Sequence, residues 1–377
     1  MEKKILIVAS LDGFANSVWP TKMQQYITQK GHHVEILDTF YFGRLSNRKG
    51  TIGTYLPKPS LYGFILYCLE FLWYFIRKFL PNQAKYFGYY FITSIMKARK
   101  IIIKNIISNR YYDLIVCGSP IDSQFIAETD DICRTLLTCP APLADELYYS
   151  NMITGDKHEK LRELETRIFK SCTYLSFHWH TLANYVKKYY KYDKDNIFIM
   201  NFGTEEASRK AEYNEKLKII FLGYLGGHWV NFPLLSRLSK IYPIDVYGSP
   251  APDPKYQLNY KGYAPSEVLS EYQFGLITIT QDTLRREGGF SAKHLDYLAH
   301  GLPVLIPEWR EYAKDLKGTV LFNENNFLNQ IKYYSQREEW EFLSKEALKQ
   351  ARELTWENTF RVLDDILDLS ETLEMPL

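Results

Sequence analysis

Disulfide frameworks, cysteine metal motifs and a strong net charge are all missing from this sequence of 377 residues. It has five cysteines, and this odd number without a close pair predicts reduced thiols in a cytosolic protein and no metal site. The formal net charge of +2 gives no general attraction to nucleic acid. Because the pattern Gly-x-Gly-x-x-Gly is also absent, NAD and FAD are disfavoured as cofactors.

An apolar run long enough to cross a membrane is absent as well. Residues 61–76 are almost wholly apolar but contain Glu70, and a spanning helix needs about 20 apolar residues. Eight basic residues follow, which are Arg77, Lys78, Lys85, Lys97, Arg99, Lys100, Lys104 and Arg110. We expect residues 60–110 to form an interfacial amphipathic helix and basic helices that bind an anionic membrane surface. A buried helix pair with a solvated basic face is the alternative.

What the sequence does contain is a regular alternation of apolar strands and helices, which predicts parallel sheets. The expected strands lie at 5–10, 33–37, 112–119, 136–143, 172–177, 197–203, 217–222, 244–248, 274–279, 304–307 and 320–322. The length suggests two domains, and the polar stretch 204–215 is the expected linker. We therefore predict an α/β protein with two Rossmann-like, doubly wound domains at 1–203 and 204–355. A last helix, 356–377, is expected to cross back to the first domain.

The most informative segment runs from Ser291 to Leu305. Its pattern indicates an amphipathic helix that ends at Gly301, followed by a buried strand after Pro303. Lys293 and Asp296 are three residues apart and share one helical face. A lysine and the amides at a helix start suit a diphosphate, and a carboxylate suits ribose hydroxyls. These features favour a nucleotide-sugar site.

This segment resembles the donor-binding signature of GT-B glycosyltransferases, chiefly glycosyltransferase family 4 and the xanthan glucuronosyltransferase type. There a lysine and, three residues later, an acid precede Tyr-Leu-Ala-x-Gly-x-Pro-Val, as they do here. The resemblance implies the GT-B fold, in which two domains face a cleft, and a UDP-sugar donor without cofactor or metal. An ordinary helix-to-strand junction with a surface lysine and aspartate is the alternative.

The resemblance also implies roles for single residues. Family 4 places two glutamates with seven residues between them, whereas eight residues separate Glu287 from Asp296 here. The element Ser291-Ala292-Lys293 is closer to the Ser-x-Lys of the xanthan type, whose members invert the anomeric configuration. Inversion is therefore slightly favoured over retention. Arg286 is a further expected donor contact.

An inverting enzyme needs a general base that deprotonates the acceptor hydroxyl. By position, Asp145 resembles the first-domain aspartate of the xanthan type, and Glu146 beside it is the next candidate. A helix N-cap for 146–152 is the other interpretation of Asp145. On the same acceptor side we place Asp12, Gly13 and His178.

A second donor-side element follows the strand 217–222. Gly223, Gly226 and Gly227 precede a predicted helix, so their backbone amides are expected to receive a diphosphate. A tight strand-to-helix turn is the alternative. His178 and His180 are expected to end a strand on one face, without a third ligand for a metal.

Together these features predict a glycosyltransferase of polysaccharide biosynthesis. Its donor is expected to be a UDP-sugar, and its acceptor a lipid-linked or saccharide molecule at the inner face of the cell membrane. The expected location is cytoplasmic and peripheral on that face, without nucleic acid as a partner. A UDP-sugar epimerase of the same fold, or a non-catalytic subunit that anchors a partner transferase, remains open.

Overall fold

The computed structural model describes residues 2–11, 14–40, 54–55, 61–128 and 133–372. The predicted acceptor-side residues Asp12 and Gly13 lie outside these ranges. The chain forms two compact units. Unit 1 comprises residues 1–178, 182–200 and 362–377, and unit 2 comprises residues 179–181 and 201–361. The predicted domain boundaries, after residues 203 and 355, lie within six residues of the changes from one unit to the other after residues 200 and 361.

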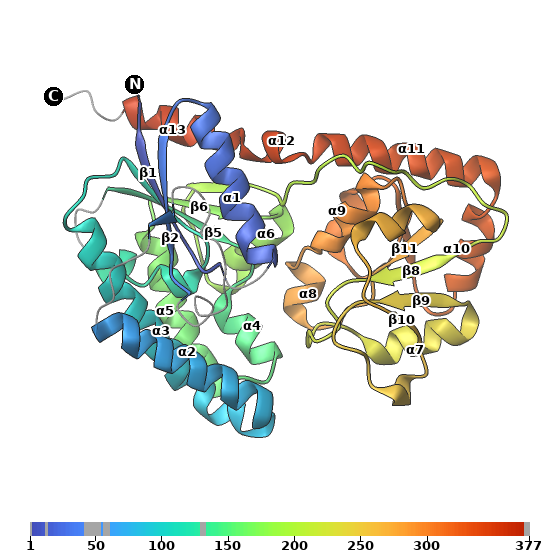
Figure 1. Cartoon of the computed structure of the whole chain (residues 1–377), viewed down its shortest axis with the longest axis horizontal. Helices are drawn as coiled ribbons and strands as arrows, with labels where there is room; N and C mark the ends of the chain where they lie inside the picture. The colour runs from blue at the N-terminus through green and yellow to red at the C-terminus, as the bar shows by residue number, and fades with distance from the viewer. Residues whose placement is uncertain (1, 12–13, 41–53, 56–60, 129–132, 373–377) are drawn as a thin grey trace. The chain divides into compact units, whose positions relative to one another are not determined.

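Unit 1 is built on a parallel sheet, as its apolar strands predict (Figure 1). Its described strands have the order β3-β2-β1-β4-β5-β6-β7. They are β1 Lys4–Ala9, β2 His33–Asp38, β3 Thr54–Tyr55, β4 Leu114–Cys117, β5 Arg134–Cys139, β6 Tyr174–Phe177 and β7 Ile197–Ile199. The helices are α1 Phe14–Gln29, α2 Leu61–Phe79, α3 Pro81–Ile107, α4 Leu143–Tyr149, α5 Gly155–Ser171, α6 His180–Tyr189 and α13 Val362–Thr372. The four residues of β4 are all buried, as expected for a strand covered on both faces.

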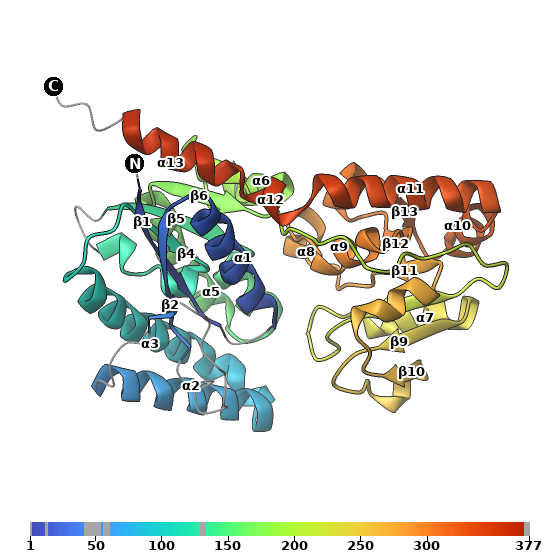
Figure 2. The same cartoon turned by 45° about the horizontal axis from the view of Figure 1, so that its top comes forward.

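Unit 2 repeats this architecture with a smaller parallel sheet, seen from two directions in Figures 1 and 2. Its described strands have the order β10-β9-β8-β11-β12-β13. They are β8 Ile219–Leu222, β9 Ile244–Tyr247, β10 Asn259–Gly262, β11 Phe274–Leu276, β12 Val304–Pro307 and β13 Thr319–Phe322. The helices are α7 Phe232–Ile241, α8 Thr283–Glu287, α9 Ala292–Ala299, α10 Phe327–Tyr334, α11 Arg337–Glu353 and α12 Trp356–Phe360. The predicted fold class, two doubly wound α/β domains, is confirmed.

The C-terminal segment differs from the single helix predicted from residue 356. Thr355 caps α12, its hydroxyl accepting from the Asn358 amide, and a second helix, α13, begins at Val362. Only α13 belongs to unit 1, where the Tyr26 hydroxyl donates to Asp364 at 2.9 Å. The change from unit 2 to unit 1 therefore occurs between two short helices.

Candidate functional site

The helix of the predicted signature, α9, is fixed over the sheet of unit 2 by one tyrosine. The buried Tyr297 hydroxyl accepts from the Leu222 amide at 2.9 Å, at the end of β8. Its ring lies on β11, where a Cβ added to Gly275 would be only 2.5 Å from Tyr297. Only glycine fits such an approach. Tyr297 thus brings α9 to the carboxyl end of the sheet, where α/β proteins bind ligands.

Lys293, in the first turn of α9, packs against the glycine loop that follows β8. Its ammonium lies 4.2 Å from the centroid of the Phe221 ring, a cation–π contact. A Cβ added to Gly223 would lie 2.2 Å from Lys293 Cε, and the φ angle of Gly223 is +150°. Residue 223 must therefore be glycine for Lys293 to lie here. The structure brings these two predicted donor-site residues together.

The electrostatics of Lys293 suit an incoming anion. Burial lowers the pKa of Lys293 to about 8, and the nearby Asp296 acts in the opposite direction. Asp296 lies one turn further along α9 with an exposed side chain. Desolvation by the surrounding protein raises the pKa of Asp296, and the Lys293 ammonium acts in the opposite direction without cancelling this rise. An anion beside Lys293 would hold its ammonium in the charged form.

The glycine loop itself differs from the prediction. No helix starts at Gly227: α7 begins at Phe232, and the Asn231 side chain caps it by accepting from the Leu234 amide at 3.0 Å. A Cβ at Gly226 would lie 2.5 Å from the Tyr224 hydroxyl, and one at Gly227 would lie 2.3 Å from the Trp229 ring. The loop is therefore covered by aromatic rings rather than continued into a helix. The predicted helix-opening role of these glycines is wrong.

A polar chain that the sequence analysis missed lies beside this loop. Asp282 caps α8 by accepting from the Arg285 amide at 2.9 Å, and the Arg285 guanidinium approaches the same carboxylate at 3.4 Å. Arg285 Nη2 also lies 3.0 Å from His228 Nε2. A guanidinium only donates, so His228 Nε2 is the acceptor in this contact. The N-cap pattern at Asp282 was readable in the sequence, but the partnership with His228 was not.

The remaining predicted donor-side residues lie at the end of α8 and just before α9. Arg286 is exposed and forms an ion pair with Glu287 at 3.0 Å, at the end of α8. Ser291 stands at the N-cap position of α9 but makes no capping hydrogen bond there. The resemblance to family 4 also implies that Glu287 is the first acid of its pair and a catalytic residue, and this role stays a prediction.

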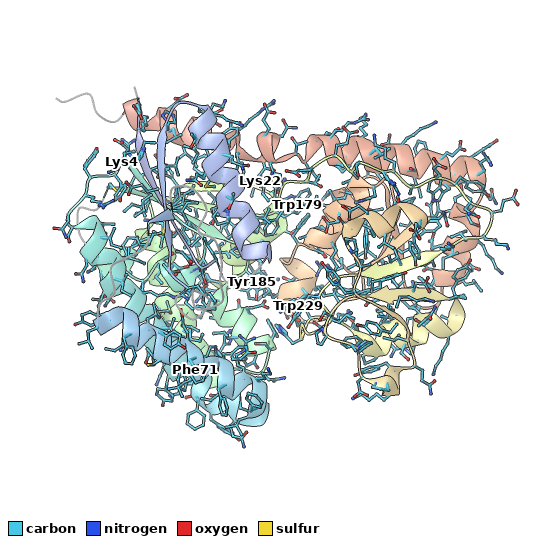
Figure 3. All side chains as sticks on the ribbon, in the orientation of Figure 1. Lys4, Lys22, Phe71, Trp179, Tyr185 and Trp229 are labelled. Atoms are coloured by element: carbon cyan, nitrogen blue, oxygen red, sulfur yellow. The ribbon has the colours of Figure 1, made fainter. Side chains whose placement is uncertain are left out.

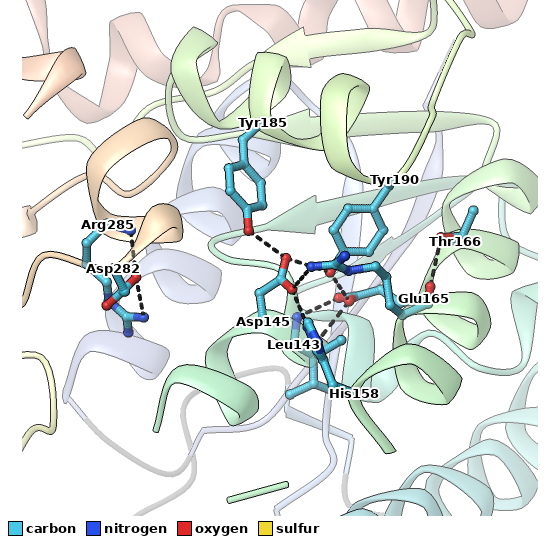
Figure 4. Close-up of polar contacts among 11 residues, drawn as sticks. Leu143, Asp145, His158, Glu165, Thr166, Tyr185, Tyr190, Asp282 and Arg285 are labelled. Carbon is cyan, nitrogen blue, oxygen red and sulfur yellow. Dashed lines mark hydrogen bonds and ion pairs between the residues drawn. The ribbon is translucent and has the colours of Figure 1, made fainter. Parts of the chain in front are cut away.

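In unit 1, the Asp145 carboxylate is surrounded by hydrogen-bond partners and does not reach the surface (Figure 4). It lies in the first turn of α4 and is fully buried. Its Oδ1 lies 2.5 Å from both His158 Nε2 and Arg162 Nη2 on α5. Its Oδ2 accepts from the hydroxyls of Tyr185 at 2.9 Å and Tyr190 at 3.1 Å. Burial alone would raise the pKa of Asp145, but the hydrogen bonds from His158 and Arg162 outweigh it and lower the pKa.

A second buried carboxyl group, Glu165, completes this cluster. It accepts from the first amides of α4, Leu143 at 2.6 Å and Ala144 at 3.1 Å, and contacts the Tyr190 hydroxyl at 2.9 Å. Burial raises the pKa of Glu165 to about 8, so it carries a proton at neutral pH. Together Glu165 and Asp145 fasten α4 to its neighbours, which is a structural role. The alternative interpretation of Asp145 as the N-cap of a helix over 146–152 is wrong, because the helix already begins at Leu143.

The assignment of Asp145 as the general base stays a prediction that this geometry does not favour. A base must reach the acceptor hydroxyl, and a fully buried carboxylate with four donors has no accessible lone pair for it. The neighbouring Glu146 is half-buried on the same turn.

The histidine pair does not have the predicted arrangement. β6 ends at Phe177 and α6 begins at His180, so the two histidines do not alternate along a strand. His178 is buried and donates from Nδ1 to the Met200 carbonyl at 3.0 Å, and burial lowers its pKa to about 4. His180 Nε2 instead lies 3.3 Å from Asp315. Among the described residues no three His, Cys, Asp or Glu side chains gather to form a metal-ion site.

Comparison with known proteins identifies the fold but no close relative. No protein-family model and no curated protein sequence matches the chain. Sucrose-phosphate synthase from Thermosynechococcus elongatus is similar in structure, with 12% identity, a TM-score of 0.67, and coverage of 99% of this chain and 100% of that chain. A glycosyltransferase from Rickettsia africae is 12% identical over 100% of both chains, with a TM-score of 0.58. An α-glucosyltransferase in complex with UDP-glucose and DNA is 11% identical over 98% of both chains, with a TM-score of 0.54.

At these identities the likeness establishes the fold, and the chain has the GT-B fold. Activity has to be argued from the site itself, because one fold hosts many functions.

Proposed function

We propose that this protein is a glycosyltransferase that takes a sugar from a UDP-sugar bound by unit 2 and transfers it to an acceptor bound by unit 1. The observation that carries the proposal is the approach of Lys293 to Gly223 at the carboxyl end of the sheet. A partly desolvated ammonium at this edge suits a diphosphate, and Asp296 one turn away suits ribose hydroxyls. The glycosyltransferases of the same fold, one of them in complex with UDP-glucose, support it.

Replacement of Lys293 by alanine should weaken UDP binding by about 1.5–3 kcal/mol, the usual range for a hydrogen bond to a charged group. Titration calorimetry with UDP measures this loss directly. The affinity of the unmodified protein should also fall from about pH 7 to about pH 9, because Lys293 loses its proton near pH 8. Lys293→Arg stays charged over that interval and should show a smaller fall.

Unchanged UDP affinity in a folded Lys293→Ala protein would refute the donor site. A protein that binds UDP but turns over no UDP-sugar in any acceptor mixture would instead be the non-catalytic subunit. Interconversion of free UDP-sugars without an acceptor would indicate the epimerase.

We place a lipid-linked acceptor at the surface formed by α2 and the first half of α3, which we call the hairpin face. α2 buries Gly63, Leu66, Glu70 and Trp73 on one side. Its other side exposes large apolar side chains, as does the start of α3; Phe71 is labelled in Figure 3. They are Leu61, Tyr62, Phe64, Ile65, Phe71, Leu72, Tyr74, Phe75 and Phe79 on α2, and Tyr86, Phe87 and Tyr90 on α3. No described helix is long and apolar enough to cross a bilayer.

Seven of the eight cations predicted for this region divide into two groups, and the eighth, Lys97, is exposed on α3. Lys78 and Lys85 lie over exposed aromatic rings of the hairpin face, as expected where side chains meet lipid headgroups, and Arg77 lies over the buried Trp73. The other group is used within unit 1, and its members Arg99, Lys100, Lys104 and Arg110 bond to acidic side chains or a backbone carbonyl. Attraction to a membrane is therefore expected to depend more on apolar insertion, and less on charge, than eight free cations would imply.

Vesicles that contain an anionic phospholipid should bind the protein, and high salt should weaken this binding only in part. The triple variant Phe64→Ser, Phe71→Ser, Phe75→Ser should abolish flotation with such vesicles, because these exposed rings supply the apolar contact. Phe342→Ser with Tyr333→Ser, which removes exposed rings from unit 2, is the control and should float normally. If the unmodified protein does not bind anionic vesicles at low salt, the proposal of a lipid-linked acceptor loses its support.

We further propose that the reaction inverts the anomeric configuration, with Glu146 as the base. Glu146 lies on the first turn of α4, which begins shortly after the carboxyl end of β5, and its side chain is not enclosed as that of Asp145 is. Asp145 and Glu165 would then hold the helix that presents the base. Analysis of the product's anomeric configuration decides between inversion and retention.

A further inference from the structure

The most deeply enclosed cation of unit 2 has no acidic ion-pair partner among the described residues. Arg310 follows β12 and is fully buried, the largest side chain in the described chain to be so. Burying a cation costs several kcal/mol unless it is compensated. Arg310 must therefore be held by contacts that are specific enough to offset this cost.

Those contacts are two backbone carbonyls, one in α8 and one in the segment between α8 and α9. Arg310 Nη1 donates to the Arg285 carbonyl and Nη2 donates to the Gly289 carbonyl, both at 2.6 Å. The first carbonyl belongs to the last turn of α8, where the helix carries partial negative charge. One planar guanidinium thus bridges a helix end and the loop that leaves it, which a lysine cannot do in the same way.

The same loop is also held by aromatic contacts of Phe290. Phe290 lies 4.8 Å from the Tyr312 ring and 5.4 Å from the Trp179 ring, measured between centroids. The Arg310 guanidinium lies over Tyr312 at 4.7 Å. The path from Arg285 to Ser291 is consequently fixed at three points before it enters α9.

We propose that Arg310 is a positioning residue for the donor, an inference that rests on the proposed function. Its fork fixes the chain at Arg285, whose side chain meets His228 beside the glycine loop. It also fixes the chain at Gly289, four residues before Lys293. By holding both ends of this segment, Arg310 sets the distance between the Arg285 guanidinium and the Lys293 ammonium, which packs against Gly223 of the glycine loop.

The test uses two variants. Arg310→Met removes both hydrogen-bond donors, and Arg310→Lys keeps the charge but loses the planar pair of donors that bonds the two carbonyls. UDP affinity should fall about tenfold or more in both variants, the loss expected for one charge-assisted hydrogen bond or more. Trp340→Phe is the matched control, because it removes another buried donor to a backbone carbonyl of unit 2, at 2.7 Å from Gln273. It should lose thermal stability yet bind UDP as the unmodified protein does.

A second readout needs no ligand. Hydrogen exchange at the Gly288 and Gly289 amides, which both bond to the Leu284 carbonyl, should accelerate in the Arg310 variants and not in Trp340→Phe. Unchanged exchange would refute the proposal that Arg310 holds this segment. It would do so even if the unmodified protein did not bind UDP and the proposed function were wrong. Faster exchange with unchanged UDP affinity would overturn the role of Arg310 in donor binding.

Discussion

Asp145→Asn should destabilise unit 1 by about 3–5 kcal/mol, the range for removal of one partner from a buried ion pair. The asparagine keeps the size of the side chain but removes the negative charge opposite Arg162 and His158. It also places an amide group where only donors converge, so at least one buried donor loses its acceptor. Urea unfolding of unmodified and variant proteins measures the change in the free energy of unfolding.

Glu35→Gln is the control for this loss. Glu35 also binds an arginine and a tyrosine, Arg110 and Tyr112, but lies nearer the solvent. Its neutralisation should cost much less, because water can replace the lost contacts. At a temperature where Asp145→Asn is folded, its turnover should stay within about tenfold of normal. A folded variant with normal stability and no turnover would restore Asp145 as the base.

The pH dependence of unit 1 follows from the same cluster. The folded-state pKa of Asp145 is lowered, so its contribution to stability is present above the unfolded value of about 4 and is lost as the pH falls through the folded value. Glu165 has the opposite sign, because its folded pKa near 8 lies above its unfolded value. Its contribution declines as the pH rises from about 4 to about 8. Unit 1 is therefore expected to lose stability both at low pH, through Asp145, and as the pH rises toward 8, through Glu165.

The sequence predicts features that arise within one helix or one strand. The spacing of Lys293 and Asp296 depends on helical periodicity alone, and the strands of both sheets are short apolar runs bounded by turns. What could not be predicted depends on contacts between distant segments. The sequence predicts Arg99 among the basic residues that bind a membrane surface, yet the side chain is buried between Glu70 at 2.7 Å and Asp122 at 2.8 Å.

The environment of Asp145 shows the same limit at the candidate site. An aspartate that follows a strand with two prolines looks like a residue at the mouth of a sheet, and the nearby helix does begin there. Its partners come from α5, from α6 and from Tyr190 just after α6, 13 to 45 residues further along the chain. No local pattern states which face of those helices turns toward Asp145. An exposed active-site carboxylate and a buried anchor therefore give the same sequence signal.

Glu146→Gln should lower turnover about a hundredfold or more while UDP affinity and stability stay unchanged. The glutamine keeps the shape of the side chain and cannot accept the proton of the acceptor hydroxyl. Glu146 belongs to unit 1 and the proposed donor site to unit 2, which is the reason to expect no change in UDP binding. The measurement is release of UDP from the UDP-sugar that the unmodified protein turns over, with calorimetry for UDP affinity.

The variants at residues 145 and 146 distinguish a structural role in holding α4 from a role in catalysis. If α4 serves to present Glu146, Asp145→Asn loses stability and Glu146→Gln loses turnover, and neither shows the other's defect. Near-normal turnover in Glu146→Gln would remove the proposed base. A product that keeps the donor's anomeric configuration would also refute inversion, and Glu287 with Asp296 would then be the acids to test, as a variant of the family 4 pair. If the product is inverted and the turnover of Glu146→Gln is near normal, the base lies elsewhere in unit 1.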